Sequence, residues 1–195
     1  WAAFDFLTKQ AEKHTVKHLV LLGDLTDRKD NHPSRLVNRL VDTLMDLPFK
    51  SITWVMGNHD CADPTSPFFK WIGRFDRLYF VARPTLLELD DKPCLFLPNA
   101  KNPVEEWESL PWNGIAAYFM HQPVGGALMW NGTKMDASVG VGLLDFLQAK
   151  TKAPGYSGDL HSPQTIWPIT YLGAPHPVYF NDTYAFDLTT DTWRT

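Results

Sequence analysis

Two stretches decide the fold of this chain: residues 18–24, His-Leu-Val-Leu-Leu-Gly-Asp, and residues 51–60, Ser-Ile-Thr-Trp-Val-Met-Gly-Asn-His-Asp. In each, a short apolar run typical of a buried strand stops at a glycine, and polar residues follow at once. Between them, apolar residues recur three or four positions apart from Leu36 to Leu47, and Pro33 is well placed to open that helix. Strand, helix and strand in this order predict a βαβ unit and therefore a parallel sheet.

The rest of the chain continues the α/β pattern. Apolar spacing predicts helices over residues 1–12, 67–75 and 142–150. Short apolar or β-branched runs bounded by Gly, Pro or Asp predict further strands. These strands are expected at residues 78–82, 85–89, 94–97, 115–120, 155–157, 169–172, 177–180 and 184–188.

Length and composition exclude several classes of protein. The 195 residues favour one domain, 1–195, and 44% hydrophobic residues exclude intrinsic disorder. A net charge of −4 argues against a basic protein that coats nucleic acid, although it leaves room for a local basic patch. Two cysteines cannot form a disulfide framework, so a reducing cytoplasm is expected. No apolar run reaches the roughly 18 residues that a membrane helix needs.

Polar side chains that can bind metal recur where the predicted strands end. They are Asp24, the run Asn58-His59-Asp60, His121, and the pair Asp159 and His161. In an open α/β sheet, ligands bind at the carboxyl ends of the strands, so these side chains are expected to converge. Oxygen and nitrogen ligands without thiolate suit Mn²⁺, Fe or Zn²⁺ better than Ca²⁺ or a structural zinc.

Each of these motifs also has a simpler explanation when it is taken alone. A Gly-Asp pair after a strand is usually a plain turn, and a single histidine at a strand end is usually a satisfied structural residue. The combination favours a metal site, because four strand ends carry suitable ligands in one chain.

These motifs together resemble those of the calcineurin-like metallophosphoesterases. The resemblance rests on Gly23-Asp24-Leu25-Thr26-Asp27, Gly57-Asn58-His59-Asp60, His121 and Gly158-Asp159-Leu160-His161. The segments Tyr156 to Gln164 and Tyr171 to Pro175, followed by Phe180, resemble a phage and bacterial branch similar to the nuclease subunit of the double-strand-break repair exonucleases. The resemblance implies a β-sandwich of two mixed sheets flanked by helices.

The resemblance also implies a role for each site residue. Asp24 would bridge two divalent metal ions, Asn58, His121 and Asp159 would complete the second metal site, and His161 would bind the first metal. His59 would face the phosphate and protonate the leaving oxygen or stabilise the transition state, and a hydrogen bond that it donates to Asp60 would orient it. The metal pair would acidify a bridging water, and the resulting hydroxide would attack phosphorus.

The chain departs from the family pattern in two places. The family usually has His where Asp159 stands, and the carboxylate hardens the site toward Mn²⁺ or Mg²⁺. The Asp-x-His motif of the family's first strand does not precede Asp24, so we expect an N-terminally incomplete domain lacking that strand. The first metal would keep only Asp24 and His161, and we expect it to bind weakly.

The expected function is therefore metal-dependent hydrolysis of phosphodiesters, with DNA as substrate and Mn²⁺ as metal; Mg²⁺, Fe and Zn²⁺ are the alternatives. Arg28 and His32, with Lys29 beside them, are candidate phosphate-binding residues, although a solvated charged loop explains them equally well. Alternative functions are a phosphomonoesterase, a cyclic-nucleotide phosphodiesterase, and an impaired metal-binding scaffold. An ATPase subunit is a candidate partner, no membrane is expected, and a phage origin would place the protein in the host cytoplasm.

Overall fold

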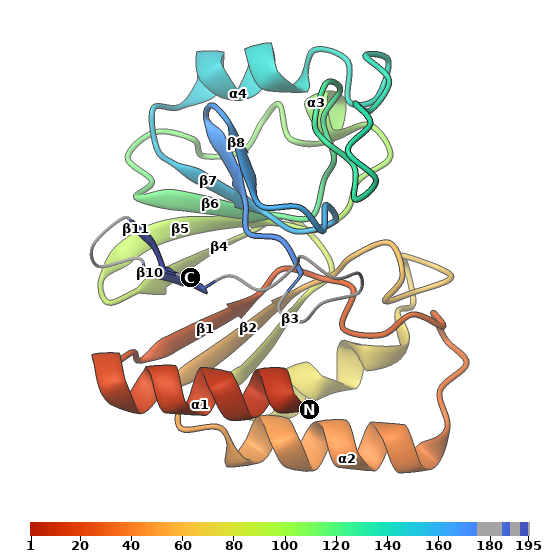
Figure 1. Cartoon of the computed structure of the whole chain (residues 1–195), viewed down its shortest axis with the longest axis vertical. Coiled ribbons are helices and arrows are strands. Elements are labelled where there is room, and N and C mark those ends of the chain that lie inside the picture. The colour runs from red at the N-terminus through yellow and green to blue at the C-terminus, as the bar shows by residue number, and fades with distance from the viewer. Residues whose placement is uncertain (175–184, 188–191, 195) are drawn as a thin grey trace. The chain divides into compact units, whose positions relative to one another are not determined.

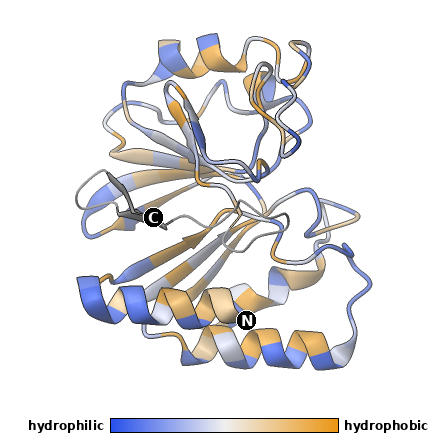
Figure 2. Ribbon diagram, viewed as in Figure 1, coloured by the Kyte–Doolittle hydropathy of each residue, from blue (hydrophilic) through white to orange (hydrophobic). Residues whose placement is uncertain are grey.

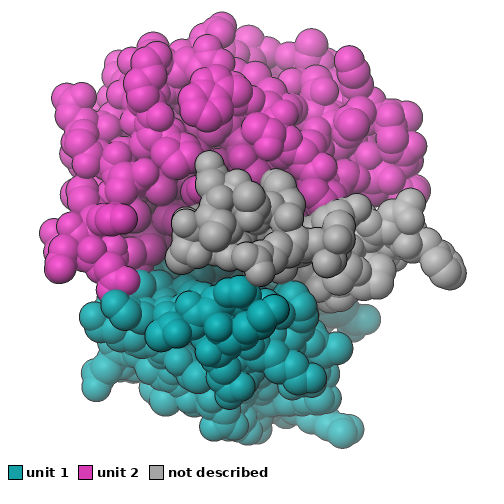
Figure 3. Space-filling view, turned by 60° about the vertical axis from the view of Figure 1, so that its left-hand side comes forward, with its two compact units in different colours: residues 1–82 teal, residues 83–195 magenta. Residues whose placement is uncertain are grey.

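The computed structural model describes residues 1–174, 185–187 and 192–194. The chain divides into two compact units, Trp1–Ala82 and Arg83–Thr195, which are coloured separately in Figure 3 and whose elements are labelled in Figure 1. Among the described residues, no helix combines the length and the apolar character needed to cross a membrane.

Unit 1 contains the predicted βαβ arrangement. Its strands form a parallel sheet in the order β1-β2-β3, which confirms the parallel pairing expected from the sequence. The elements in chain order are α1 (Ala2–His14), β1 (His18–Leu21), α2 (Ser34–Asp46), β2 (Ser51–Val55), the 3₁₀ helix η1 (Phe68–Arg74) and β3 (Leu78–Val81).

The core of unit 1 lies on one face of this sheet. Side chains at alternate strand positions point to the same face, and α1 and α2 turn their apolar sides toward it (Figure 2). The largest buried side chain there is Trp54, which packs against Phe69 of η1 with 4.8 Å between ring centroids. The core is formed by Ala11, Leu19, Leu21, Leu40, Leu44, Leu47, Phe49, Ile52, Trp54, Phe69, Ile72 and Leu78.

Unit 2 contains the second sheet that the family resemblance implied. It is a six-stranded mixed sheet in the order β4-β5-β6-β7-β9-β8, in which β5, β6, β7 and β9 are parallel and the two edge strands are antiparallel to their neighbours. Its elements are β4 (Thr85–Leu89), β5 (Lys92–Leu97), α3 (Pro103–Glu106), β6 (Ala117–Met120), α4 (Leu143–Lys150), β7 (Gly155–Ser157), β8 (Gln164–Ile166) and β9 (Ile169–Tyr171).

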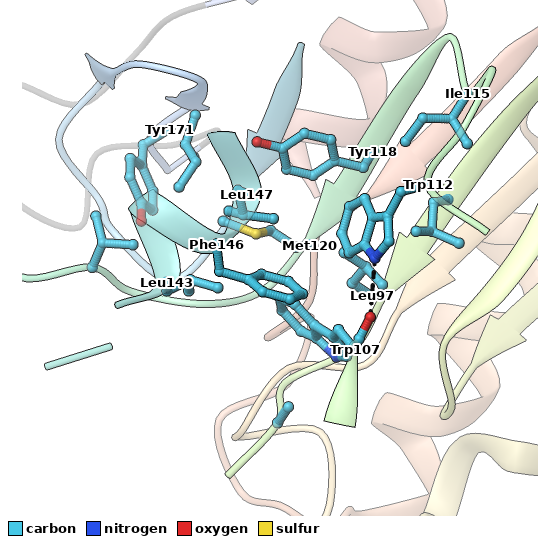
Figure 4. Close-up of a cluster of buried hydrophobic side chains, with 14 of the residues drawn as sticks. Leu97, Trp107, Trp112, Ile115, Tyr118, Met120, Leu143, Phe146, Leu147 and Tyr171 are labelled. Atoms are coloured by element: carbon cyan, nitrogen blue, oxygen red, sulfur yellow. Dashed lines mark hydrogen bonds between the residues drawn. The ribbon is translucent and has the colours of Figure 1, made fainter. Parts of the chain in front are cut away.

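A dense cluster of aromatic and aliphatic side chains fills the space between α4 and one face of this sheet (Figure 4). Trp107 and Tyr118 are fully buried within it. The Trp112 Nε1–H donates to the Trp107 carbonyl at 3.0 Å, so this indole is a structural group of the core. Burying rings of this size is the main favourable term for such a unit.

Two strands of the described chain lie outside the predicted pattern. β8 was not predicted, because three residues of mixed polarity carry too little periodicity to identify a strand. Near the C-terminus, β10 (Ala185–Asp187) pairs antiparallel with the unpredicted β11 (Thr192–Arg194), and it falls within the predicted strand 184–188. The predicted strand 177–180 lies outside the described residues.

Strand register brings the loops that follow the parallel strands to one edge of each sheet. In unit 1, Leu21 of β1 lies opposite Trp54 of β2, so the loops beginning at residues 22 and 56 leave the sheet side by side. In unit 2, Met120 of β6 lies opposite Ser157 of β7, with the same result for the next two loops. The predicted site residues all lie in these four loops.

A buried carboxylate joins the two loops of unit 1. Asp60 is fully buried, and its oxygens accept hydrogen bonds from the backbone N–H groups of Asp24, Thr26 and Gly57 and from Trp54 Nε1–H, at 2.8–3.4 Å. Burial raises the pKa of the Asp60 carboxyl above its ordinary value, and the N–H donors counteract that rise. One side chain therefore satisfies donors from both loops and from β2.

We predict that Asp60→Asn destabilises the chain by about 2–3 kcal/mol. The amide has one acceptor oxygen in place of two and turns an N–H₂ toward N–H donors, which leaves buried polar groups unpaired. The measurement is the urea-unfolding midpoint, with Asp76→Asn at an exposed position as the control that leaves it unchanged. An equal midpoint for Asp60→Asn and wild type would contradict the role assigned to this carboxylate.

Candidate functional site

Unit 1 contributes the first group of predicted ligands, in the loops after β1 and β2. Asp24 has a left-handed backbone conformation (φ 52°), which aspartate tolerates better than most residues. Its Oδ1 accepts the backbone N–H of His59 at 2.8 Å, so the two loops are fastened to each other at the ligand itself. Asn58, next to His59, is exposed. The structure thus brings Asp24 and His59 together, with Asn58 next to His59 in the same loop.

Gly57 is required because Asp24 lies so close to it. A Cβ atom built on Gly57 would lie 2.2 Å from Asp24 Oδ1 and 2.6 Å from its backbone nitrogen, far inside van der Waals contact. Any side chain at position 57 would therefore displace Asp24. The apolar run of β2 stops at this glycine in the sequence, and the structure supplies the reason for the glycine in the approach of the neighbouring loop.

The structure corrects the predicted partner of His59. Among the described residues, the Asp60 carboxylate pairs with the three backbone groups and the indole described above and not with this ring. Instead, His59 Nδ1 lies 3.3 Å from the Asp27 carbonyl oxygen and 3.4 Å from Asp27 Oδ1. Both side chains are substantially exposed, at 43% and 92%, so this contact orients the ring more than it stabilises the fold.

Sequence reasoning missed the role of Asp27. The residue closes the stretch 23–27 on which the family resemblance rests, but no function was assigned to it. The available signal was its acidic side chain at the end of that stretch, whereas its contact with His59 depends on how two loops 32 residues apart fold together.

Unit 2 contributes the second group of predicted ligands, in the loops after β6 and β7. His121 is 1% exposed, and its Nε2 lies 3.5 Å from Asp159 Oδ1. Asp159 has a left-handed backbone conformation (φ 73°), as Asp24 does in unit 1. His161 Nδ1 is buried and has no hydrogen-bond partner among the described residues. A buried ring nitrogen without a hydrogen-bond partner in the protein fits the role of a metal ligand.

A network of neutral polar groups holds the His121 loop. The Gln122 backbone N–H donates to Ser157 Oγ, and the Gln122 carbonyl accepts from both Ser157 Oγ and the Tyr171 hydroxyl, at 3.0–3.2 Å. Asn99, at the end of β5, donates from Nδ2 to the His121 carbonyl at 3.3 Å. Burial raises the pKa of the Tyr171 hydroxyl, so Tyr171 stays protonated and acts as a donor. Sequence analysis assigned none of these supporting roles.

The two predicted phosphate-binding residues line a cavity in unit 1. Arg28 is exposed on the loop after β1, and His32 packs against Phe68 and Phe69 with ring centroids 5.0 and 4.9 Å away. Both residues contribute to the wall of a cavity of about 350 Å³ that also includes Asp27. The structure therefore places them on one concave surface beside the partner of His59.

The donor set fits a hard or borderline divalent metal ion. Asp24, Asn58 and Asp159 offer oxygen, His121 and His161 offer nitrogen, and the two cysteines are buried elsewhere in the cores. Such a set is the one that Mn²⁺, Mg²⁺, Fe and Zn²⁺ use in proteins. The buried His161 Nδ1 without a partner agrees with this fit.

Comparison with known proteins agrees with this donor set. The sequence matches the calcineurin-like phosphoesterase family over residues 1–175. A solved structure described as a novel archaeal phosphodiesterase is similar to this chain with a TM-score of 0.51 and 8% sequence identity, covering 99% of this chain and 90% of the other. At that identity the likeness concerns the fold. No curated protein sequence matches the chain.

The family match spans nearly the whole described chain, and the family implies divalent metal ions in the enzyme. The strand-end residues and the two-sheet fold are consistent with it. The chain belongs to the calcineurin-like phosphoesterases, and it is a metal-dependent phosphoester hydrolase.

Proposed function

We propose that this enzyme hydrolyses phosphodiester bonds, with DNA as its substrate, in a single catalytic domain formed by the whole chain. The observation that carries the proposal is the pairing of Asp24 with His59, in which the carboxylate accepts the backbone N–H of the histidine at 2.8 Å. This hydrogen bond keeps the carboxylate that would bind metal, Asp24, next to the proton donor, His59. The two residues can therefore act on the same phosphoryl group.

The proposed ligands are Asp24 and Asn58 from unit 1 and His121, Asp159 and His161 from unit 2. When bound, the divalent ions polarise the phosphoryl oxygens and lower the pKa of water. Mn²⁺ is the proposed metal, since a carboxylate at position 159 adds a hard, charged ligand.

The protein's own contribution to catalysis is orientation and proton transfer. We place His59 against the phosphate with Nε2 toward the leaving oxygen, because Nδ1 is directed to Asp27. Asp27 then fixes the ring orientation, so that Nε2 can protonate the departing alkoxide. Asp60 acts indirectly, because it holds in place the loops that carry Asp24 and His59.

DNA is favoured over small phosphomonoesters by the basic residues near this histidine. Arg28 and Lys29 are exposed in the loop after β1, and Lys29 N–H donates to the His59 carbonyl at 3.0 Å. Cations in that position attract a polyanionic chain more than a single small ester. We further propose that the enzyme is a nuclease of the branch that the segments Tyr156 to Gln164 and Tyr171 to Pro175 resemble. It would work in the cytoplasm with an ATPase subunit as its partner.

We predict that His59→Ala lowers kcat for bis(p-nitrophenyl) phosphate by about 10²–10⁴-fold in the presence of Mn²⁺. His14→Ala, at the end of α1, is the control for contaminating activity and leaves the rate unchanged. Equal rates for His59→Ala and wild type would show that the hydrolysis comes from elsewhere and that a scaffold role is the better account.

Asp27→Asn tests the orienting role separately. We expect kcat to fall about tenfold, less than for His59→Ala, because the contact is exposed and the ring itself remains. The loss is expected in kcat, with KM little changed, because the contact orients the ring and does not bind the substrate. A rise in KM without a fall in kcat would argue against the assignment, and so would a kcat equal to that of the wild type.

Metal binding gives a test that does not depend on activity. We predict that Asp159→Ala and His161→Ala each weaken Mn²⁺ binding at least tenfold, measured by isothermal titration calorimetry. Asp145→Ala, on the exposed side of α4, is the matched control and should bind Mn²⁺ as the wild type does. Undiminished binding in both ligand variants would contradict the proposed ligand set.

The class of ester is tested by comparing substrates. We expect kcat/KM for bis(p-nitrophenyl) phosphate and for DNA to exceed that for p-nitrophenyl phosphate and for cyclic nucleotides. A preference for the monoester or for the cyclic diester would replace DNA hydrolysis with the corresponding alternative function.

A further inference from the structure

Two cavities of unit 1 adjoin each other along the start of α2. The first, of about 350 Å³, is lined by Thr26, Asp27, Arg28 and His32 among others, and the second, of about 260 Å³, by Trp1, Arg35 and Arg39. Pro33 and Leu36 belong to the walls of both. We call this continuous concave surface the α2 groove. It begins at Asp27, the residue that contacts His59.

The first turn of α2 gives the groove a positive potential. The residue before the helix is Pro33, which offers no side-chain cap, and the first turn contains no acidic residue. It carries Arg35 instead, although acidic side chains are the usual choice at this end of a helix. The Leu36 and Val37 N–H groups donate to the Pro33 carbonyl, so the N–H groups of Ser34 and Arg35 are the ones that this 13-residue helix can offer to a ligand beside a cation.

A second observation in the groove points to a ligand independently of the helix. Thr26 is 7% exposed and lines the first cavity, and its buried hydroxyl has no hydrogen-bond partner among the described residues. Both ring nitrogens of His32, in the same wall, are likewise buried and without a partner there. Buried polar atoms are nearly always satisfied in folded proteins, so three unpaired atoms around one cavity indicate a polar occupant.

The second cavity offers features that suit nucleotides. The Arg39 guanidinium lies 4.1 Å from the centre of the Trp1 ring, and Trp1 remains 39% exposed. Arg35 and Arg39 are one helical turn apart and both exposed, so they stand on the same side of α2. Surfaces that bind single-stranded nucleic acid combine arginines, which contact phosphates, with aromatic rings, on which bases stack.

We propose that the α2 groove binds the nucleotides of a single DNA strand that flank the scissile phosphate. A phosphate of the strand meets the start of α2 and Arg28, the Thr26 hydroxyl and His32 hydrogen-bond the nucleotide in the first cavity, and the next nucleotide lies against Arg35, Arg39 and Trp1. This assignment rests on the proposed function, because it places the strand relative to His59. It narrows the substrate class from phosphodiesters in general to single-stranded DNA or a single-stranded end.

The test is the binding of a fluorescein-labelled dT12 strand by fluorescence anisotropy in Mn²⁺. All variants carry His59→Ala, so that the strand is not cleaved. We expect the added pair Arg35→Ala and Arg39→Ala to raise Kd at least tenfold. The slope of log K against log salt should fall by about 1.4, since each phosphate contact on a single strand contributes about 0.7. Arg74→Ala, an exposed arginine of unit 1 outside the groove, is the matched control and should change neither quantity.

Thr26→Val tests the first cavity without removing a charge. The valine side chain has the same shape, so we expect the thermal stability to be kept or raised while Kd for dT12 rises about threefold or more. The proposal would be overturned if the Arg35→Ala and Arg39→Ala pair changed Kd and the salt slope no more than Arg74→Ala does. An unchanged Kd for Thr26→Val would also overturn it. The two proposals can fail separately. If the wild-type chain hydrolyses no phosphodiester but binding of dT12 still depends on Arg35 and Arg39, the groove is supported and the proposed function is overturned.

Discussion

The buried Asp60 carboxylate is the interaction on which the unit 1 part of the site depends. The loops after β1 and β2 leave the sheet where its hydrogen-bond ladder ends, so their backbone N–H groups need other acceptors. Asp60 supplies them to Asp24, Thr26 and Gly57 at once. Moving its charge out of water is costly, and four N–H donors aimed at one carboxylate offset that cost. The position of the candidate metal ligand Asp24 therefore depends on Asp60, a residue that has a structural role and no direct role in the reaction.

Unit 2 supports its ligands by a different chemistry. The His121 loop is held by amide, hydroxyl and phenol groups, of which Ser157 Oγ and the Tyr171 hydroxyl both donate to the Gln122 carbonyl. The charged group that the structure records beside His121 is Asp159, whose Oδ1 lies 3.5 Å from Nε2. In unit 1, by contrast, the support is a charged group, the Asp60 carboxylate, which accepts the backbone N–H of Asp24 at 2.9 Å.

The sequence predicted those parts of the structure that short-range patterns determine. The strand ends that carry Asp24, His59 and His121 were located correctly, because an apolar run followed by glycine or a polar residue marks the end of a buried strand. The mixed second sheet came only from family resemblance, since strand order among short strands is decided by long-range pairing. The partner of His59 was predicted wrongly for the same reason: it is Asp27 and not Asp60, and long-range packing decides which of them contacts the ring. Two carboxylates in neighbouring motifs look alike in sequence, and only burial separates the structural one from the exposed one.

The left-handed backbone at Asp159 bears on how this enzyme could have diverged from its relatives. At a φ of 73°, aspartate, asparagine and histidine are tolerated far better than branched or longer side chains. The histidine common at this position in the family and the aspartate found here can therefore replace each other without rebuilding the loop. Glutamate would bring the same carboxylate but not the same tolerance. A single substitution can thus exchange a borderline imidazole ligand for a hard carboxylate, so metal preference can change while the scaffold stays the same.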